Sequence, residues 1–231
     1  MIKTVFFDFY DTVVTTDPSR EELQRQACQE LGVSADTSDI PRGYWYADDF
    51  LSRENARLSI QKRSPEEKMD FWASYEYILL KEAGIEITKE LALKIVNRLR
   101  QLDRKLVLFN DVIPAMSMLK ERGLFLGLIS NLNYSLDSFC DELGLTPYLD
   151  LTLTSSEIGS EKPQPPIFLA ALKCAGASPA EAIHVGDQYQ SDVRGAQGVG
   201  INPLLLDRFG FWENISDCPR IQSLEEVVNH L

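Results

Sequence analysis

An aspartate near the start of the chain stands where a short apolar segment ends. Residues 4–7 (Thr-Val-Phe-Phe) are rich in β-branched and aromatic side chains, which predicts a strand buried on both faces. Asp8 follows that segment directly, and Asp11 and Thr12 come soon after it. Open α/β sheets bind ligands at the carboxyl ends of their strands. Asp8 is therefore a candidate functional carboxylate, although an aspartate that only caps a turn has the same local pattern.

Further polar residues follow later apolar segments of the chain. Ser130 and Asp187 each stand where such a segment ends, and Lys162 lies in the loop after another. Two carboxylates at one sheet edge, Asp8 and Asp187, suit a hard cation such as Mg²⁺. A serine hydroxyl and a lysine ammonium are suitable partners for phosphate oxygens. An aspartate is also a known nucleophile toward phosphorus, so these residue types together indicate phosphate chemistry.

The elements that must position these residues alternate between strand and helix. Apolar segments predict the strands, and the residues between them have the spacing of amphipathic helices. We expect strands at residues 4–7, 124–129, 149–153, 182–185 and 202–206, and helices at 114–121, 135–143, 166–174 and 192–197. Such alternation is typical of a parallel, doubly wound sheet. The predicted fold class is therefore α/β, with a Rossmann-like core.

Residues 15–105 have a different pattern and read as helices only. Asp17-Pro18 predicts a helix start with Pro at its first position, and Ser64–Glu67 is a capping box that opens a later helix. We therefore expect two domains: a Rossmann-like catalytic core of residues 1–14 and 106–231, and a helical insertion of residues 15–105.

Composition excludes several functional classes. Lys and Arg number 23 against 35 Asp and Glu, so the net charge of −12 argues against binding to nucleic acid or to an anionic membrane. No apolar run approaches the roughly 20 residues that span a bilayer. The four cysteines lack metal-ligand spacing, and we find no signal peptide, so we expect reduced thiols in a cytoplasmic protein. A monomer and a homodimer both remain open.

Taken together, the polar motifs resemble those of the haloacid dehalogenase-like hydrolase (HAD) superfamily. Four motifs carry the resemblance, in order along nearly the whole chain: Phe-Asp-Phe-Tyr-Asp-Thr-Val at 7–13, Ile-Ser-Asn at 129–131, Glu-Lys-Pro at 161–163, and His-Val-Gly-Asp at 184–187 with Asp192 five residues on. Each motif alone is weak, but all four on their expected elements are specific. The position of the helical insertion resembles the subfamily with a helical cap between the first and second motifs.

The resemblance implies a role for each matching residue. Asp8 would be the nucleophile and would form an aspartyl intermediate. The implied catalytic residues are Asp8, Tyr10, Thr12, Ser130 and Lys162. The implied phosphate-binding residues are Thr12, Ser130, Asn131 and Lys162. The implied Mg²⁺ ligands are Asp8, Asp187 and the backbone carbonyl of Tyr10, with Asp192 orienting Lys162 or a metal-bound water.

Some positions depart from the pattern of the phosphatases in this superfamily. Most carry an Asp two residues after the nucleophile as general acid and base, and Tyr10 stands there instead. Tyr at this position resembles the 2-haloacid dehalogenases, which use the same aspartate without metal. Those enzymes, however, replace the acids of the fourth motif with Ser and Asn and usually have Tyr where this chain has Phe168. Asp11 also replaces the usual Gly; it either takes over the acid/base role or caps a turn.

The acidic fourth motif favours the phosphatase interpretation. Carboxylates beside Asp8 repel one another unless a cation is present, and they would oppose an incoming haloacid. We therefore expect a Mg²⁺-dependent phosphatase that acts on a small phosphorylated metabolite. The alternatives are a 2-haloacid dehalogenase and a weakly active or non-catalytic phospho-ligand binder. His184 lies inside a predicted strand, and we interpret it as a packed core histidine.

Overall fold

The computed structural model describes residues 1–34, 37–213 and 215–231. The chain forms two compact units. The α/β unit consists of Met1–Thr15 and Val107–Leu231, and the helical unit consists of Thr16–Leu106. Among the described residues, no helix combines the length and the apolar character needed to cross a membrane.

A six-stranded sheet forms the centre of the α/β unit, and every neighbouring pair of its strands is parallel. The strands are β1 (Thr4–Phe7), β4 (Phe125–Ser130), β5 (Leu151–Thr154), β6 (Ala182–Gly186), β7 (Asn202–Leu206) and β8 (Arg220–Ile221), in the spatial order β5-β4-β1-β6-β7-β8. All four residues of β1 are buried, as a strand covered on both faces requires. The predicted α/β class with a parallel, Rossmann-like sheet is confirmed.

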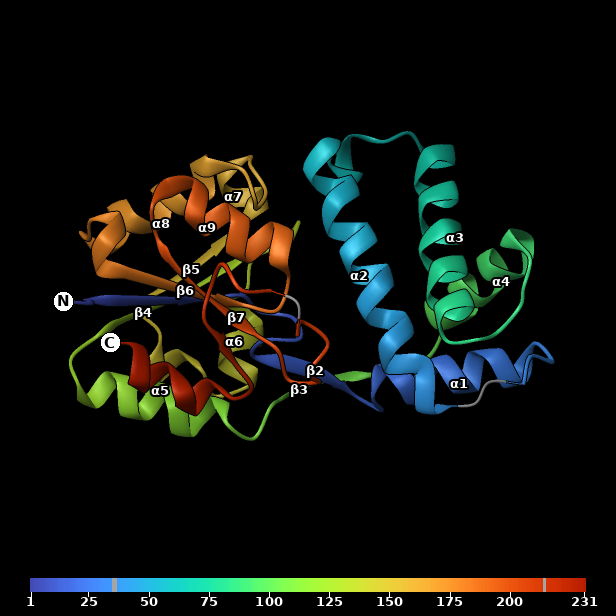
Figure 1. The fold of residues 1–231 in the computed structure, drawn as a ribbon, viewed down its shortest axis with the longest axis horizontal. Coiled ribbons are helices and arrows are strands. Elements are labelled where there is room, and N and C mark those ends of the chain that lie inside the picture. Colours follow the sequence, from blue (N-terminus) through green and yellow to red (C-terminus); the bar gives the residue numbers. More distant parts are fainter. Residues whose placement is uncertain (35–36, 214) are drawn as a thin grey trace. The chain divides into compact units, whose positions relative to one another are not determined.

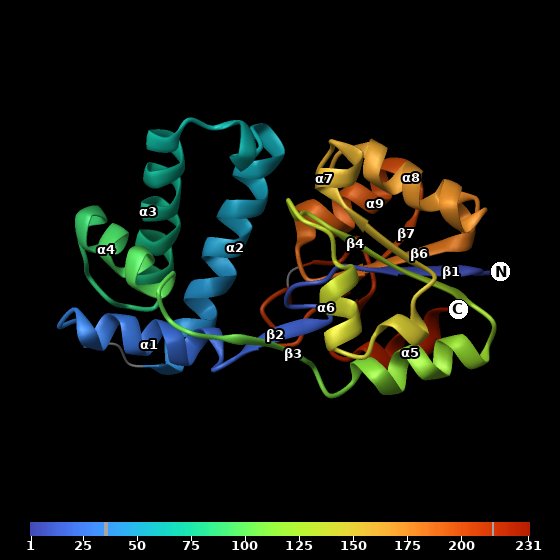
Figure 2. The ribbon, with the colours of Figure 1, turned by 180° about the vertical axis from the view of Figure 1, so that it is seen from behind.

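Helices cover both faces of this sheet. They are α5 (Val112–Glu121), α6 (Asp137–Glu142), α7 (Ser155–Ile158), α8 (Pro165–Ala175) and α9 (Arg194–Val199). Both views place α7, α8 and α9 on one face and α5 with the C-terminal 3₁₀ helix, Leu224–His230, on the other (Figures 1 and 2). The core beneath α8 and α9 includes Phe6, Ile129, Ile167, Phe168 and Ala196. These fully apolar contacts fix the sheet edge that carries the polar residues.

The helical unit contains α1 (Arg20–Glu30), α2 (Ile40–Arg57), α3 (Pro65–Glu82) and α4 (Lys89–Leu99). Helices α2 and α3 lie side by side and run in opposite directions (Figure 1). The capping box at Ser64 is confirmed, because its hydroxyl accepts from the Glu67 N–H while the Glu67 carboxylate accepts from the Ser64 N–H. The core of this unit consists of Leu23, Ala27, Cys28, Ile40, Tyr44, Ala47, Leu79, Leu80, Ala83, Ile95 and Leu102.

Two features inside the helical unit bear on its stability. A Cβ atom added at Gly43 of α2 would lie 2.3 Å from the carbonyl oxygen of Leu79 on α3, so the two backbones approach as closely as only glycine permits. The second feature is a buried polar cluster. Gln24 donates to Glu76 at 2.5 Å, and the Tyr44 hydroxyl donates to Gln24 at 3.2 Å. Glu76 is 1% exposed.

The expectation of helices only over residues 15–105 is wrong at both edges. β2 (Val14–Asp17) and β3 (Lys105–Leu108) pair in a two-stranded sheet. The predicted helix start at Asp17-Pro18 is also wrong. Helix α1 begins at Arg20 because Ser19 and Glu22 form a capping box, with each side chain accepting from the other's backbone N–H. A side-chain oxygen that satisfies an orphan N–H defines the helix start better than a proline does.

Several short helical turns complete the chain. Besides Leu224–His230, the 3₁₀ helices in the described part of the chain are Thr37–Asp39, Ile60–Lys62, Thr146–Tyr148 and Pro179–Glu181. A π-helical turn, Tyr189–Val193, precedes α9, so the helix expected at residues 192–197 begins as a widened turn. Such turns are frequent at functional sites. This one carries Asp192.

Candidate functional site

The register of three strands brings the predicted polar residues to one edge of the sheet. Phe7 of β1 pairs with Leu128 of β4 on one side and with Val185 of β6 on the other. Asp8 continues this pairing, because its N–H donates to the Val185 carbonyl at 2.9 Å. The strands β4 and β6 end at Ser130 and Gly186, so Asp8, Ser130 and the fourth-motif acid follow at the same edge.

The Lys162 ammonium is buried between two carboxylates. Its Nζ lies 2.5 Å from Asp8 Oδ1 and 2.6 Å from Asp192 Oδ1. Burial alone would lower the pKa of Lys162, but Asp192 and Asp8 outweigh it and raise the pKa. Burial raises the pKa of Asp8 to about 6, and the nearby Asp192 charge adds to the rise while Lys162 opposes it. The cation therefore stays charged, and it supports the ionised form of Asp8 in a site that desolvates the carboxylate.

Asp192 is fixed from several directions. Its Oδ1 also lies 2.9 Å from His184 Nε2, and its Oδ2 accepts from the Gln188 N–H at 3.1 Å. Burial would raise the pKa of Asp192, but Lys162 and His184 hold it well below its usual range. Gly186 leaves room for this carboxylate, because a Cβ there would lie 2.2 Å from the Asp192 Cγ. Asp192 thus stays ionised beside Lys162.

His184 is completely buried and neutral, because burial lowers its pKa. Its Nε2 is the nitrogen that faces Asp192, so the neutral ring carries its proton there. Its Nδ1 has no hydrogen-bond partner among the described residues, and the ring packs edge-on against Phe168 at 5.2 Å between centroids. His184 is therefore part of the polar network as well as of the core. The sequence contains one signal for this role: a histidine inside a predicted buried strand needs a hydrogen-bond partner, because buried polar groups are almost always paired.

Asn131 holds the loop that carries Lys162. Its side-chain amide donates to the Lys162 carbonyl at 2.9 Å and accepts from the Lys162 N–H at 2.7 Å. This paired contact fixes the backbone at the base of the lysine. The second and third motifs, 31 residues apart in the sequence, are thereby joined in space.

The loop after β1 makes a tight turn. The Phe9 carbonyl accepts from the N–H groups of Val13 and Val14, and Asp11 has a left-handed backbone with φ of 56°. Aspartate tolerates this conformation better than most residues, which explains how it replaces a glycine here. The turn buries Thr12 completely, and the Thr12 hydroxyl donates to Asp187 Oδ1 at 3.2 Å.

Tyr10 lies in the same turn and reaches a second tyrosine. Its hydroxyl is 2.9 Å from the hydroxyl of Tyr134, which lies in the loop after β4. Tyr134 stands outside the four motifs, so no pattern in the sequence indicated it. Tyr10 therefore places a phenol, paired with that of Tyr134, two residues after Asp8.

Three carboxylates at the sheet edge form a donor set that fits a divalent cation. One oxygen from each of Asp8, Asp187 and Asp192 lies within 4.8 Å of the other two. Carboxylate oxygens are the ligands that Mg²⁺ prefers, and a cation would offset the repulsion among three acids. Lys162 already neutralises part of this charge. The predicted carbonyl ligand, Tyr10, belongs to the same turn as Asp8.

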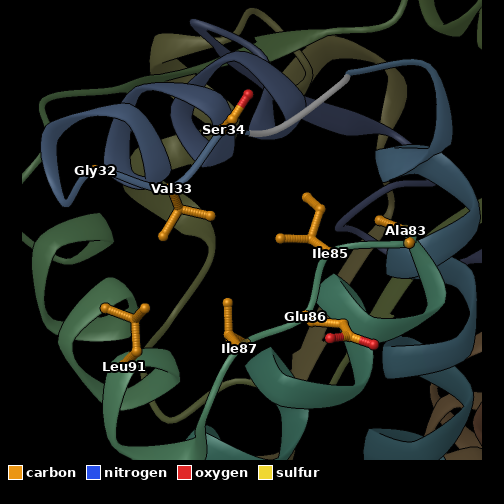
Figure 3. Close-up of a pocket in the computed structure, with 9 residues that line it drawn as sticks. Gly32, Val33, Ser34, Ala83, Ile85, Glu86, Ile87 and Leu91 are labelled. Atoms are coloured by element: carbon orange, nitrogen blue, oxygen red, sulfur yellow. The ribbon is translucent and has the colours of Figure 1, made fainter.

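A hollow inside the helical unit is lined by none of the predicted site residues. Its volume is about 570 Å³, and its walls come from residues 32–34, 83–87 and Leu91. Figure 3 shows the Val33, Ile85, Ile87 and Leu91 side chains converging on its centre. All four pack against the core of the helical unit, so the hollow is an opening at the edge of that core.

Comparison with known proteins identifies the family. The profile of the haloacid dehalogenase-like hydrolases matches residues 2–200. A glyceraldehyde 3-phosphate phosphatase of Methanopyrus kandleri is 30% identical over 100% of this chain and 99% of its own length. A phosphoserine phosphatase of Thermus thermophilus is 35% identical over 54% of this chain and 51% of its own length.

A solved structure extends the likeness to the fold. The crystal structure of the HAD-hydrolase YfnB of Bacillus subtilis bound to magnesium matches this chain with a TM-score of 0.66. It is 20% identical, and the likeness covers 100% of this chain and 98% of that one. The family profile covers most of the sequence, one relative matches from end to end, and the motifs gather at one sheet edge. This chain therefore belongs to the haloacid dehalogenase-like hydrolase family.

Proposed function

We propose that this hydrolase is a Mg²⁺-dependent phosphatase that acts on a small phosphorylated metabolite through an aspartyl-phosphate intermediate. The observation that carries the proposal is the cluster of Asp8, Asp187 and Asp192, whose oxygens lie within 4.8 Å of one another, beside the buried Lys162. The relatives named as phosphatases support the same chemistry.

Each side chain of the cluster has a part in this reaction. An Asp8 carboxylate oxygen attacks phosphorus, the bond from phosphorus to the leaving oxygen breaks, and water later hydrolyses the acyl phosphate to release inorganic phosphate. Lys162 lies 2.5 Å from Asp8, so a phosphoryl group bonded to Asp8 carries its negative oxygens beside that ammonium. Thr12 and Ser130 supply hydroxyl donors to the same oxygens.

The remaining residues hold this arrangement in place. Asp8, Asp187 and the Tyr10 carbonyl would hold Mg²⁺, which when bound neutralises charge on the transferring group. Asp192 keeps Lys162 charged and oriented, and Asn131 fixes the Lys162 backbone. We further propose that the α/β unit is the catalytic core and that the helical unit is a cap that selects the substrate.

The 2-haloacid dehalogenase alternative rests on Tyr10. Against it stand the ionised Asp192, the third carboxylate Asp187, and Phe168, which is fully buried against His184 and offers no hydroxyl. A haloacid brings its own carboxylate, which three acids without a metal ion would repel. The phosphatase proposal accounts for all three residues, and the dehalogenase alternative accounts for Tyr10 alone.

A small substrate panel tests the proposal. The purified protein is assayed for phosphate release from aryl, acyl and sugar phosphates and for chloride release from 2-chloropropionate, each with and without Mg²⁺. We expect phosphate release that requires Mg²⁺. Asp8→Asn should abolish it while the protein stays folded, because the nucleophile is lost.

Asp187→Ala provides the metal arm of the same experiment. Mg²⁺ should raise the melting temperature of the wild type by mass action, and this variant should lose that rise. Asp217→Ala, an acid on the surface that pairs with Tyr189, is the matched control and should keep the rise. Chloride release without Mg²⁺ would support the dehalogenase instead, and release of neither product would support a binder.

A further inference from the structure

An arginine outside all four motifs contacts the loop that carries the nucleophile. Arg208 lies two residues beyond the end of β7. Its Nη2 donates to the backbone carbonyl of Thr12 at 2.8 Å. The same guanidinium donates to both carboxylate oxygens of Asp111, at 2.8 and 3.0 Å, and lies 4.0 Å over the Phe109 ring. Its side chain is only 13% exposed.

The partner of this arginine is itself fixed. Asp111 also accepts from the Ser223 hydroxyl at 3.0 Å and from the Leu224 N–H at 2.8 Å. Both bonds come from the C-terminal segment, which follows Asp111 in the sequence, whereas the nucleophile loop precedes it. A planar guanidinium that binds a carboxylate through two nitrogens has little freedom of orientation. The direction in which Arg208 points at Thr12 is therefore set by contacts that do not involve the loop.

Thr12 is the residue through which this contact reaches the site. Its carbonyl accepts from Arg208, and its hydroxyl donates to Asp187 Oδ1. Next to it, Asp11 has a left-handed backbone, and the Val13 carbonyl accepts from the Phe109 N–H at 3.2 Å. A tight turn with one strained residue keeps its shape only when its surroundings determine it. Arg208 supplies a charged, largely enclosed donor to the carbonyl of Thr12 in that turn.

We propose that Arg208, held by Asp111, is a positioning residue that fixes the nucleophile loop through the Thr12 carbonyl. This inference rests on the proposed phosphatase function for its catalytic readout. Loss of the contact displaces the turn and with it the relation of Asp8, Thr12 and Asp187. A displacement of about 1 Å can cost on the order of 100-fold in rate, so the effect is expected on kcat more than on KM.

The primary test compares two arginines of the α/β unit. Arg208→Met keeps the length of the side chain and removes the donors; we expect kcat to fall by about 10- to 100-fold with KM changed less than about threefold. Arg220→Met is the matched control. Arg220 forms a comparable ion pair with the buried Asp207 at 2.9 Å but is not bonded to the nucleophile loop, so its kcat should stay near the wild-type value.

Two further variants separate positioning from stability. Arg208→Ala should regain part of its kcat when millimolar methylguanidinium is added, and Arg220→Ala should show no such response. Asp111→Asn keeps Arg208 and weakens only its anchor, so its kcat should fall less than that of Arg208→Met. This milder variant also keeps the test open if Arg208→Met folds poorly.

Hydrogen exchange gives a readout that does not depend on turnover. The backbone N–H groups of residues 11–14 should exchange faster in Arg208→Met than in the wild type, relative to those of β6, and should not change in Arg220→Met. Unchanged exchange in this loop together with a kcat within twofold of wild type would overturn the proposal. If the wild type releases no phosphate, the proposed function fails, and the exchange data alone decide the role of Arg208.

Discussion

Under the proposed function, the residue two positions after Asp8 is expected to decide which leaving groups the site can release. Tyr10 offers a phenol, which is a poor general acid at neutral pH, and its hydroxyl is engaged with that of Tyr134. A departing alkoxide needs a proton, whereas an aryloxide or a carboxylate leaves without one. If the proposed phosphatase function holds, we expect the tyrosine pair to restrict the enzyme to substrates whose leaving group is already a weak base.

Tyr10→Asp tests this restriction directly. General acid–base catalysis is worth about 10²- to 10⁴-fold, so the new carboxyl should raise kcat on alkyl phosphates by at least about tenfold. The wild type should correspondingly prefer aryl and acyl phosphates to sugar phosphates. Steady-state kinetics at saturating Mg²⁺ measure both. Tyr10→Phe removes the Tyr134 contact without adding an acid and is the control.

An unchanged kcat on alkyl phosphates in Tyr10→Asp, with Mg²⁺ still bound, would contradict this view. The missing acid would then not limit the enzyme. Asp11, which lies one residue further along the turn, would be the next residue to replace.

At the residue scale, the motif residues could be predicted and their supporting partners could not. Asp8 and Asp187 stand at strand ends, where the sequence pattern alone defines the location. His184 and Arg208 act through hydrogen bonds to residues 8 and 196 positions away in the sequence. Arg208 in particular has no local pattern, because its role depends on how β7 lies relative to the turn after β1.

At the scale of elements, the crossing of α2 and α3 depends on one glycine. Gly43→Ala would place a methyl group 2.3 Å from the Leu79 carbonyl, and overpacking of this kind costs about 1–3 kcal/mol. We expect the free energy of unfolding to fall by that amount, although alanine favours helices. Urea denaturation followed by circular dichroism measures it.

Gly198→Ala is the matched control for this crossing. Gly198 lies in α9, and a Cβ there meets nothing within 4 Å. The same substitution should leave stability unchanged or raise it by up to about 1 kcal/mol. Equal effects at the two positions would contradict the role assigned to the close approach.

The buried strands were the elements most open to prediction. β1, β4 and β6 are short apolar segments bounded by polar residues, and the pattern located each within about a residue. β2, β3 and β8 were missed because they are short and partly exposed, with no continuous apolar run. Their pairing depends on a partner that is distant in the sequence. Local patterns cannot contain that information.

At the scale of the whole molecule, the buried Glu76 couples stability to pH. Burial raises the pKa of Glu76 to about 7, with the Gln24 hydrogen bond opposing the rise. The folded state therefore binds more protons than the unfolded state between pH 4.5 and about 7, so the free energy of unfolding falls as pH rises through this range. The loss is on the order of 3 kcal/mol and is complete above about pH 7.

Glu76→Gln should remove this dependence, because glutamine keeps an acceptor for Gln24 and carries no proton to lose. Urea denaturation at pH 5 and pH 8 should show the variant gaining stability over the wild type only at the higher pH. Glu66→Gln, at an exposed position of the same helix, should show no such difference. A variant effect that is equal at both pH values would argue against the coupling.

The central position of β1 also governs the order in which the molecule can fold. Thr4 pairs with Phe125 and Ala182, so both neighbours of the first strand leave the ribosome more than a hundred residues after it. The helical unit is continuous in sequence and can form during that interval from contacts nearer along the chain. We expect the apolar Val-Phe-Phe segment to stay without its native strand partners during that interval. We therefore expect Asp8, whose N–H bonds to the Val185 carbonyl, to reach its place only when strand β6 arrives, late in synthesis.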